Sequence, residues 1–288
     1  MATLNEQVNE IKNSNRSLAS AQRDFVKLGL RPYEISLLIS EMKKERKTFN
    51  VTFGVEIECF CQRNLAEQRF TSNNVSYRYE GYNHRDNKSY FKFVSDASVV
   101  GLENPIECVS PILQGKKGMN DLKACCKSLN EAGAQVNKTC GLHVHVGIND
   151  ERQFVNVVKN YRVLEALIDT FMAQSRRANN SRWCQSLRGK NFSACDCIDL
   201  VRAEMDYDRY YKVNAEAYER HHTIEFRQHQ GTTDFEKISH WVNFCCKLVA
   251  WSKDHVLDHD SFIYNISEIP FLNEEEKRFF YRRAQELA

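Results

Sequence analysis

The sequence predicts an α+β protein that has one main domain and an N-terminal helical extension. Short segments in which apolar and polar residues alternate, as in strands, are interspersed with longer segments that have the apolar spacing of helices. Hydrophobic residues make up 42% of the 288 residues, which is enough for a sizeable buried core. We therefore expect residues 1–50 to form the extension and residues 51–288 to form the domain that carries the function.

Each element follows from a local pattern. Residues 1–50 have helical spacing, and Pro32 is placed to begin a helix. The strands are expected at 51–60, 89–95, 104–109, 141–147, 209–215 and 222–229. The later helices are expected at 116–132, 151–175, 234–254 and 273–286, with Asn273 as a cap of the last. The polar and aromatic stretch 61–88 has no clear period, and we expect a loop or hairpin there.

Composition excludes several classes of function. The net charge of +2 lacks the basic excess that general nucleic-acid binding requires. No run approaches the roughly 20 apolar residues that cross a membrane, and the polar start of the chain lacks the apolar centre of a signal peptide. The 11 cysteines are an odd number. We expect a cytoplasmic protein with reduced thiols.

Four of the predicted strands share one design, in which one face is apolar and the other carries ionisable groups. The ionisable residues are Glu56 and Glu58 in 51–60, Glu107 in 104–109, His143 and His145 in 141–147, and Glu225 and Arg227 in 222–229. For any single strand, an ordinary solvent-facing surface is the simpler explanation. The absence of lysine from these positions, and the repetition over several strands, favour a binding face instead.

The residue types indicate metal and phosphate chemistry. Adjacent carboxylates such as Glu56 and Glu58 repel each other unless a cation lies between them. A carboxylate-rich set favours Mg²⁺ or Mn²⁺, and an imidazole is compatible with Mn²⁺. Arg227 suits an oxyanion such as phosphate, because its planar fork matches two oxygens. Cations beside a phosphate-binding arginine are typical of a phosphoryl-transfer site.

The chain resembles the amidoligase family, which belongs to the carboxylate–amine ligases with a glutamine synthetase-like fold. The similarity runs from about residue 50 to 255 and rests on the segments FGVEIECF, SDASVVG, NPIECVSPILQG, KTCGLHVHVGIND, SRWC and KVNAEAYERHHTIEFRQHQGTTDFEKISHWV. The resemblance implies a curved antiparallel sheet with helices on its convex face. It also implies that the concave face binds ATP and two or three Mg²⁺ or Mn²⁺ ions.

The resemblance further implies a reaction and roles for residues. A carboxylate would attack ATP to give an acyl phosphate and ADP, and an amine would then displace phosphate. Five matched residues would be metal ligands, with Glu56, His143 and Glu225 near the nucleotide and Glu58 and Glu107 near the substrate carboxylate.

The remaining matches concern substrate contacts. Arg227 would bind the transferring phosphoryl group, and His145 would lie near phosphate or substrate. Asp96 would receive the amine, and either Asp96 or Glu107 would serve as its base. Arg182 and Asn214 would contact nucleotide or carboxylate.

Two other hypotheses stay open. A metal-dependent hydrolase would use His143, His145 and the carboxylates, but it leaves Arg227 and the Glu56–Glu58 pair without a role. A non-catalytic binding module on the same fold would bind no metal. For the ligase, the sequence leaves open which small-molecule or peptide carboxylate and which amine are joined. A homo-oligomer is compatible with the resemblance, because folds of this type sometimes complete their sites across subunits.

Two sets of residues have simpler explanations. Cys59 and Cys108 fall on apolar faces of their strands, where we expect buried small hydrophobes rather than zinc ligands. Alternation places His229 on the same face as Glu225 and Arg227, where we expect a peripheral position.

Overall fold

The computed structural model describes residues 3–12, 17–48, 51–81, 83, 89–148, 150–261 and 263–288. The chain divides into two compact units, Met1–Asn50 and Val51–Ala288. The first unit contains helices α1 (Leu4–Lys12), α2 (Leu18–Lys27) and α3 (Pro32–Thr48), the last of which begins at the proline. These helices enclose a small core of their own around Phe25, Ile35 and Met42.

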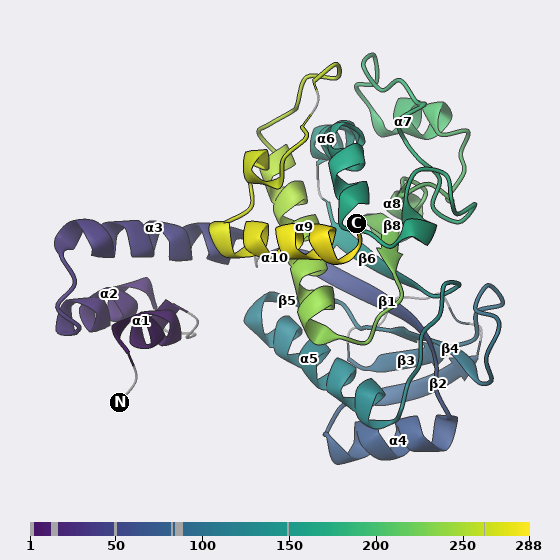
Figure 1. Ribbon diagram of the computed structural model, residues 1–288, viewed down its shortest axis with the longest axis horizontal. Helices are drawn as coiled ribbons and strands as arrows, with labels where there is room; N and C mark the ends of the chain where they lie inside the picture. Colours follow the sequence, from purple (N-terminus) through teal and green to yellow (C-terminus); the bar gives the residue numbers. More distant parts are fainter. Residues whose placement is uncertain are drawn as a thin grey trace. The chain divides into compact units, whose positions relative to one another are not determined.

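The second unit is a mixed α+β structure around one sheet of eight strands (Figure 1). Its strands are β1 (Thr52–Phe60), β2 (Tyr77–Gly81), β3 (Phe91–Val94), β4 (Pro105–Val109), β5 (Leu113–Gln114), β6 (Gly141–Gly147), β7 (Val213–Asn214) and β8 (Thr223–Gln230). Its helices are α4 (Arg63–Ser72), α5 (Gly115–Glu131), α6 (Glu151–Thr170), α7 (Ile198–Glu204), α8 (Ala217–His221), α9 (Phe235–Ser252) and α10 (Glu274–Glu286), with short 3₁₀ turns η1 (Gln174–Arg176) and η2 (Ile266–Glu268).

The sheet is mostly antiparallel, as the α+β prediction requires. Its strand order is β2-β3-β4-β1-β6-β8-β7, and β5 pairs with the beginning of β1. Among the strand pairs of the described residues, only the edge pair β2–β3 is parallel. Strands β1 and β6 therefore lie at the centre, where both neighbours fix their register.

The apolar faces of the central strands form the main core together with helices α5, α6 and α9. Phe53, Val55 and Ile57 of β1 are buried there with Val144 of β6 and Phe226 of β8. This pattern is the one that strand alternation predicts for a sheet with helices over one face. The opposite face is left for the ionisable side chains.

Two predictions of local structure were wrong. The stretch 61–88, expected to be a loop or hairpin, contains helix α4 and strand β2 among its described residues, while 82 and 84–88 lie outside them. Phe70 of α4 packs edge-on against Tyr77 and Phe93. These tertiary aromatic contacts therefore stabilise the structure of a segment whose sequence has no clear period. The predicted strand 209–215 is reduced to β7, because the rest of that segment is irregular backbone with an isolated bridge at Tyr211.

Helix ends follow the local rules more closely. Asn273 caps α10 in a reciprocal arrangement with Glu276, in which each side chain accepts a hydrogen bond from the other residue's backbone N–H. Asp150 caps α6 by accepting from the N–H of Gln153. Among the helices that the structure describes, none combines the length and the apolar character that a membrane span requires.

Candidate active site

Register brings the predicted ionisable residues together on the open face of the sheet. Glu58 of β1 lies opposite Glu107 of β4. Glu56 of β1 lies opposite His143 of β6, and the next strand pair places His145 opposite Glu225 of β8. Residues directly opposite each other on neighbouring strands have side chains within contact distance. Four strands therefore contribute to a single cluster.

Three groups in this cluster have the donor atoms and spacing of metal sites. In each group, one ligand atom per residue lies within 4.8 Å of the others. The groups are Glu56–Glu107–His143, Glu56–His145–Glu225 and Glu58–Asp96–Glu107. Carboxylate oxygens with one imidazole fit Mn²⁺, and the all-carboxylate group fits Mg²⁺ as well. The residues present thus fit the divalent ions expected from the sequence.

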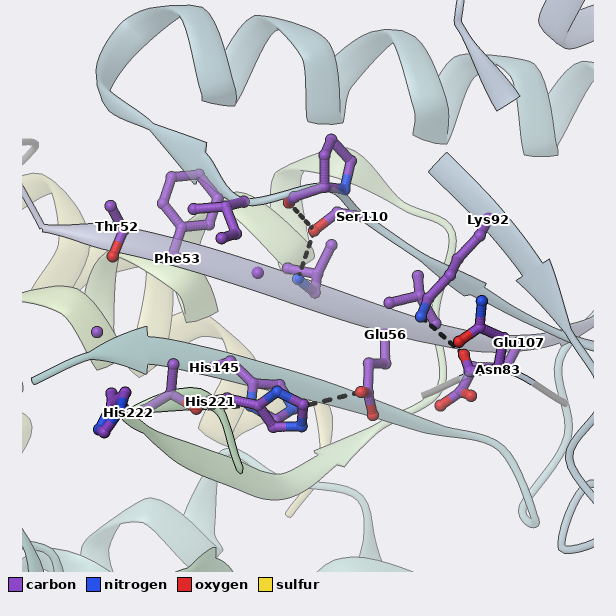
Figure 2. A pocket seen from close by; sticks show the side chains of 17 residues that line it. Thr52, Phe53, Glu56, Asn83, Lys92, Glu107, Ser110, His145, His221 and His222 are labelled. Carbon is purple, nitrogen blue, oxygen red and sulfur yellow. Dashed lines mark hydrogen bonds and ion pairs between the residues drawn. The ribbon is translucent and has the colours of Figure 1, made fainter. Parts of the chain in front are cut away.

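His143 forms a hydrogen bond with Glu56, and His145 lies within ion-pair distance of the same carboxylate. His143 Nδ1 lies 3.1 Å from one oxygen of Glu56, and His145 Nε2 lies 3.3 Å from the other. The second ring nitrogen of His145 is 3.0 Å from the hydroxyl of Thr223. Figure 2 shows His145 and Glu56 facing each other above the sheet. The Thr223 hydroxyl sets the orientation of the His145 ring, and Nε2, which is buried and has no hydrogen-bond partner among the described residues, stays available for a ligand.

The carboxylates of the cluster differ in the direction in which their surroundings shift the pKa. Burial opposes ionisation of Glu56, but the neighbouring His145 and His143 hold the pKa of Glu56 well below its usual range. Burial likewise opposes ionisation of Glu225, yet the charge of Arg227 lowers the pKa of Glu225 to about 2. Glu107 behaves in the opposite way. Burial and the negative charges of Glu56, Glu58 and Asp96 raise the pKa of Glu107 well above its usual range.

Asn214 supports the cluster from the edge strand β7. Its side-chain amide donates a hydrogen bond of 2.5 Å to Glu225, and its carbonyl oxygen accepts one of 2.9 Å from the N–H of Glu216. The sequence predicted that Asn214 contacts nucleotide or carboxylate. In the structure it lines the hollow described below and orients a candidate ligand.

Two residues beneath the cluster were missed by the sequence prediction. The N–H of Gly141 donates a 2.5 Å hydrogen bond to Glu58, and a Cβ at position 141 would come within 2.9 Å of His143 Nε2. The buried guanidinium of Arg176 donates to the carbonyl of Cys140 at 2.5 Å. Arg176 thereby fixes the backbone that holds Glu58. Arg176 belongs to no alternating pattern, and Gly141, although it begins the predicted strand 141–147, has no side chain for the alternation to single out.

An irregularity in β8 decides which side chains reach the cluster. Leu142 and Val144 of β6 pair with His229 and Phe226, so that two residues of β8 lie opposite one residue of β6. Arg227 stays on the site face and pairs with Glu225. His229 is turned to the other face, where its ring packs against Trp241 of α9. The expectation that His229 shares the face of Arg227 was therefore wrong, because a bulge breaks the alternation.

The structure also places the two remaining predicted residues. Asp96 is half-buried and joins Glu58 and Glu107 in one of the three groups. Arg182 is exposed, stacks on the ring of Trp183 at 4.3 Å, and lines neither of the two hollows beside the cluster. All 11 cysteines are free, and Cys59 and Cys108 are buried in the core, as their strand positions predict.

Two hollows meet at the cluster. The first has a volume of about 240 Å³ and is lined on the sheet by Gly54, Gly147 and Val109 (Figure 2). The second has a volume of about 360 Å³ and is walled by Asp96, Asn214 and a set of arginines. Glu56, Glu107, His145 and His221 border both hollows. Two ligands that enter from different sides would thus meet at the acidic and imidazole groups.

Comparisons with known proteins identify a family model and solved structures that are similar to this chain. The model of the family described as "Putative amidoligase enzyme" matches residues 50–249. The solved structures similar to this chain include a bifunctional glutathione synthetase from Pasteurella multocida, with 10% identity, a TM-score of 0.40 and coverage of 87% of this chain and 43% of that chain. Another is a novel glutamine synthase homolog, with 11% identity, a TM-score of 0.38 and coverage of 88% of this chain and 66% of that chain. The chain therefore spans less than two thirds of either structure. No curated protein matches it.

Proposed function

This protein belongs to the amidoligase family, and we propose that it is an ATP-dependent ligase that joins a carboxylate to an amine. A carboxylate oxygen attacks the γ-phosphorus of ATP, the bond to the β–γ bridging oxygen breaks, and an acyl phosphate and ADP form. The amine nitrogen then attacks the acyl carbon. Phosphate leaves, the amine loses a proton, and an amide results.

The observation that supports the proposal is the set of three ligand groups, two of which contain Glu56 and two of which contain Glu107. ATP, the acyl phosphate and the carboxylate are all anions, and their repulsion grows as water is excluded. Mg²⁺ or Mn²⁺ held by these groups would supply the positive charge that offsets this repulsion. Glu56 and Glu225 would hold an ion on the nucleotide side with His143, whose Nδ1 lies 3.1 Å from Glu56 and 3.5 Å from Glu225, although the ligand group that contains both carboxylates is completed by His145. Glu58 and Glu107 would hold an ion on the acceptor side, with Asp96 within reach.

The protein's own residues supply the remaining chemistry. Arg227 would bind the phosphoryl group, because its guanidinium is buried beside the cluster and is oriented by Glu225. Asp96 or Glu107 would take the proton that the amine loses, since both border the second hollow. His145 lies where the hollows meet and would donate a hydrogen bond to phosphate or substrate.

The two hollows differ in a way that fits two substrates. The first includes two glycines of the sheet, Gly54 and Gly147, and an apolar wall that includes Pro111 and Ile112. This hollow suits the flat nucleoside of ATP. The second hollow carries Asp96, Asn214 and the arginines, and it suits the carboxylate acceptor. The γ-phosphate would then lie between them, beside Arg227.

Oxygen-18 transfer tests the proposal directly. Purified protein is incubated with Mg²⁺ or Mn²⁺, ATP, an amine pool and carboxylic acids labelled with ¹⁸O in the carboxyl group. An acyl-phosphate mechanism releases ADP and moves one labelled oxygen into phosphate. Glu56→Gln should abolish both products, whereas Glu103→Gln, which changes an exposed carboxylate outside both hollows, should abolish neither.

The outcomes separate the competing hypotheses. Label-free phosphate despite ADP release would refute the acyl phosphate. Metal-dependent cleavage of an added amide without ATP would favour a hydrolase. Absence of both turnover and metal binding would favour a binding module.

A further inference from the structure

Four arginines line the second hollow, and they fall into two classes. They are Arg202, Arg209, Arg220 and Arg227. Arg202 is neutralised by Glu216, which it meets with two hydrogen bonds of 2.8 Å, and by Glu219 at 2.8 Å. Arg227 is neutralised by Glu225. These two guanidinium groups are fixed by resident carboxylates.

Arg209 and Arg220 differ, because within the described ranges neither forms an ion pair. Arg209 lies in the turn before β7, with its guanidinium 5.4 Å from the centre of the Tyr210 ring. Arg220 lies on α8, and both side chains are exposed. The two cations come from different elements and line the same hollow.

The proposed reaction leaves these two cations without a partner. The reacting carboxylate would be held beside Glu58, Glu107 and the ions, and the phosphoryl group beside Arg227. An exposed arginine pair that borders a substrate hollow gains most from an anion that binds two guanidinium forks. A ligand with a single carboxylate, engaged at the reaction centre, has no second anionic group to offer them.

We infer that the carboxylate substrate carries at least one further carboxylate, which Arg209 and Arg220 bind. The substrate class is thus a small di- or tricarboxylic acid, of which one carboxylate reacts and another anchors. This inference rests on the proposed function and deepens it, since it assigns specificity to a part of the hollow that takes no part in the chemistry.

The test compares acids of matched shape and different charge. Glutarate and butyrate are titrated by calorimetry into protein that contains Mg²⁺ and a non-hydrolysable ATP analogue. The same acids, and glutamate against glutamine, in which the side-chain carboxylate is replaced by an uncharged amide, are compared for ADP release with ATP. Glutarate should bind at least about tenfold more tightly than butyrate, because charge-assisted hydrogen bonds to arginine are among the stronger polar contacts. The difference should shrink as salt is raised.

Variants then locate the anchor. Arg209→Gln with Arg220→Gln should weaken glutarate binding by about tenfold or more and leave butyrate binding unchanged. Arg278→Gln is the matched control, because Arg278 is an exposed arginine on α10 that does not line this hollow. It should leave both acids unaffected.

Each contrary outcome identifies a different error. Equal binding of glutarate and butyrate would overturn the inference. A double variant that weakens the ATP analogue instead of glutarate would also overturn it, because the arginines would then serve the nucleotide. If no acid supports ADP release while glutarate still binds through Arg209 and Arg220, the ligase proposal fails and the dicarboxylate site stands.

Discussion

Replacing Lys212 with methionine tests a buried ion-pair network on the helix side of β7 and β8. Lys212 immediately precedes β7, and its side chain is wholly buried. Its Nζ lies 2.9 Å from Glu165 and 2.6 Å from Asp169, both on α6. Its backbone carbonyl accepts a 2.8 Å hydrogen bond from the N–H of Arg227. The network thus joins helix α6 to the strand that carries the phosphate-binding candidate.

The size of the stability loss depends on the hydrogen bonds that Glu165 and Asp169 keep in the variant. Removing one partner of a buried ion pair typically costs about 3–5 kcal/mol. Glu165 would still accept hydrogen bonds from Ser186 and Leu187, and Asp169 would still accept from Gln228 and an N–H at residue 178. These hydrogen-bond donors offset part of the carboxylate charge that loses its lysine partner. We therefore expect Lys212→Met to lower the free energy of unfolding by about 3 kcal/mol, near the lower end of that range.

Urea unfolding followed by tryptophan fluorescence measures this loss, because Trp183, Trp241 and Trp251 all lie in Val51–Ala288. Lys190→Met is the matched control. Lys190 pairs with Asp206 at 2.6 Å, but the Asp206 side chain is 75% exposed, so we expect a loss of less than about 1 kcal/mol. Equal losses in the two variants would refute the argument that burial, rather than ion-pair length, sets the cost.

Three further predictions concern stability, metal binding and the first hollow. Burial lowers the pKa of His229 to about 4, so the unfolded chain takes up the proton first as the pH falls. The stability from the neutral ring is complete above about pH 6.5 and is lost between about 6.5 and 4; from pH 7 to 5 the loss should be about 2 kcal/mol, and His229→Gln should remove that pH dependence in urea titrations. Asn214→Ala should weaken Mn²⁺ binding by about tenfold or more in electron paramagnetic resonance titrations, because it removes the donor that orients Glu225; an unchanged affinity would contradict that role. Gly54→Ala should fold, since a Cβ there meets no atom closer than 3.6 Å, and should weaken ATP binding in calorimetry because the added methyl group takes up space in the first hollow; weaker binding of the acid instead would reverse the assignment of the hollows.

The central strands could be predicted from the sequence because each has one face buried under helices. β1, β6 and β8 alternate between apolar and ionisable residues, and the alternation itself assigned Glu56 and His143 to the open face. Their distances to each other depend on strand pairing, which no local pattern specifies. Family resemblance supplied that long-range information, and the register of the sheet agrees with it.

The parts that escaped prediction depend on contacts between distant segments. Arg176 lies in a short 3₁₀ turn, and its partner at Cys140 is 36 residues away in sequence. The bulge in β8 arises from pairing with β6, and it turns His229 toward the helices against the local alternation. Helix α4 has little periodicity of its own and is held by aromatic packing around Phe70. Local spacing carries no information about any of these contacts.

The charges of the open face explain where exchangeable cations would matter most. Glu225 already has Arg227 and Asn214, and Glu56 has two histidines. Glu107 lies among Glu56, Glu58 and Asp96, and this crowding disfavours its ionised form. A divalent ion would gain most beside Glu107, because there it removes repulsion between carboxylates as well as forming new bonds. Ions bound to the folded state would then raise its stability, and they would do so at the position where the two hollows, and on our proposal the two substrates, meet.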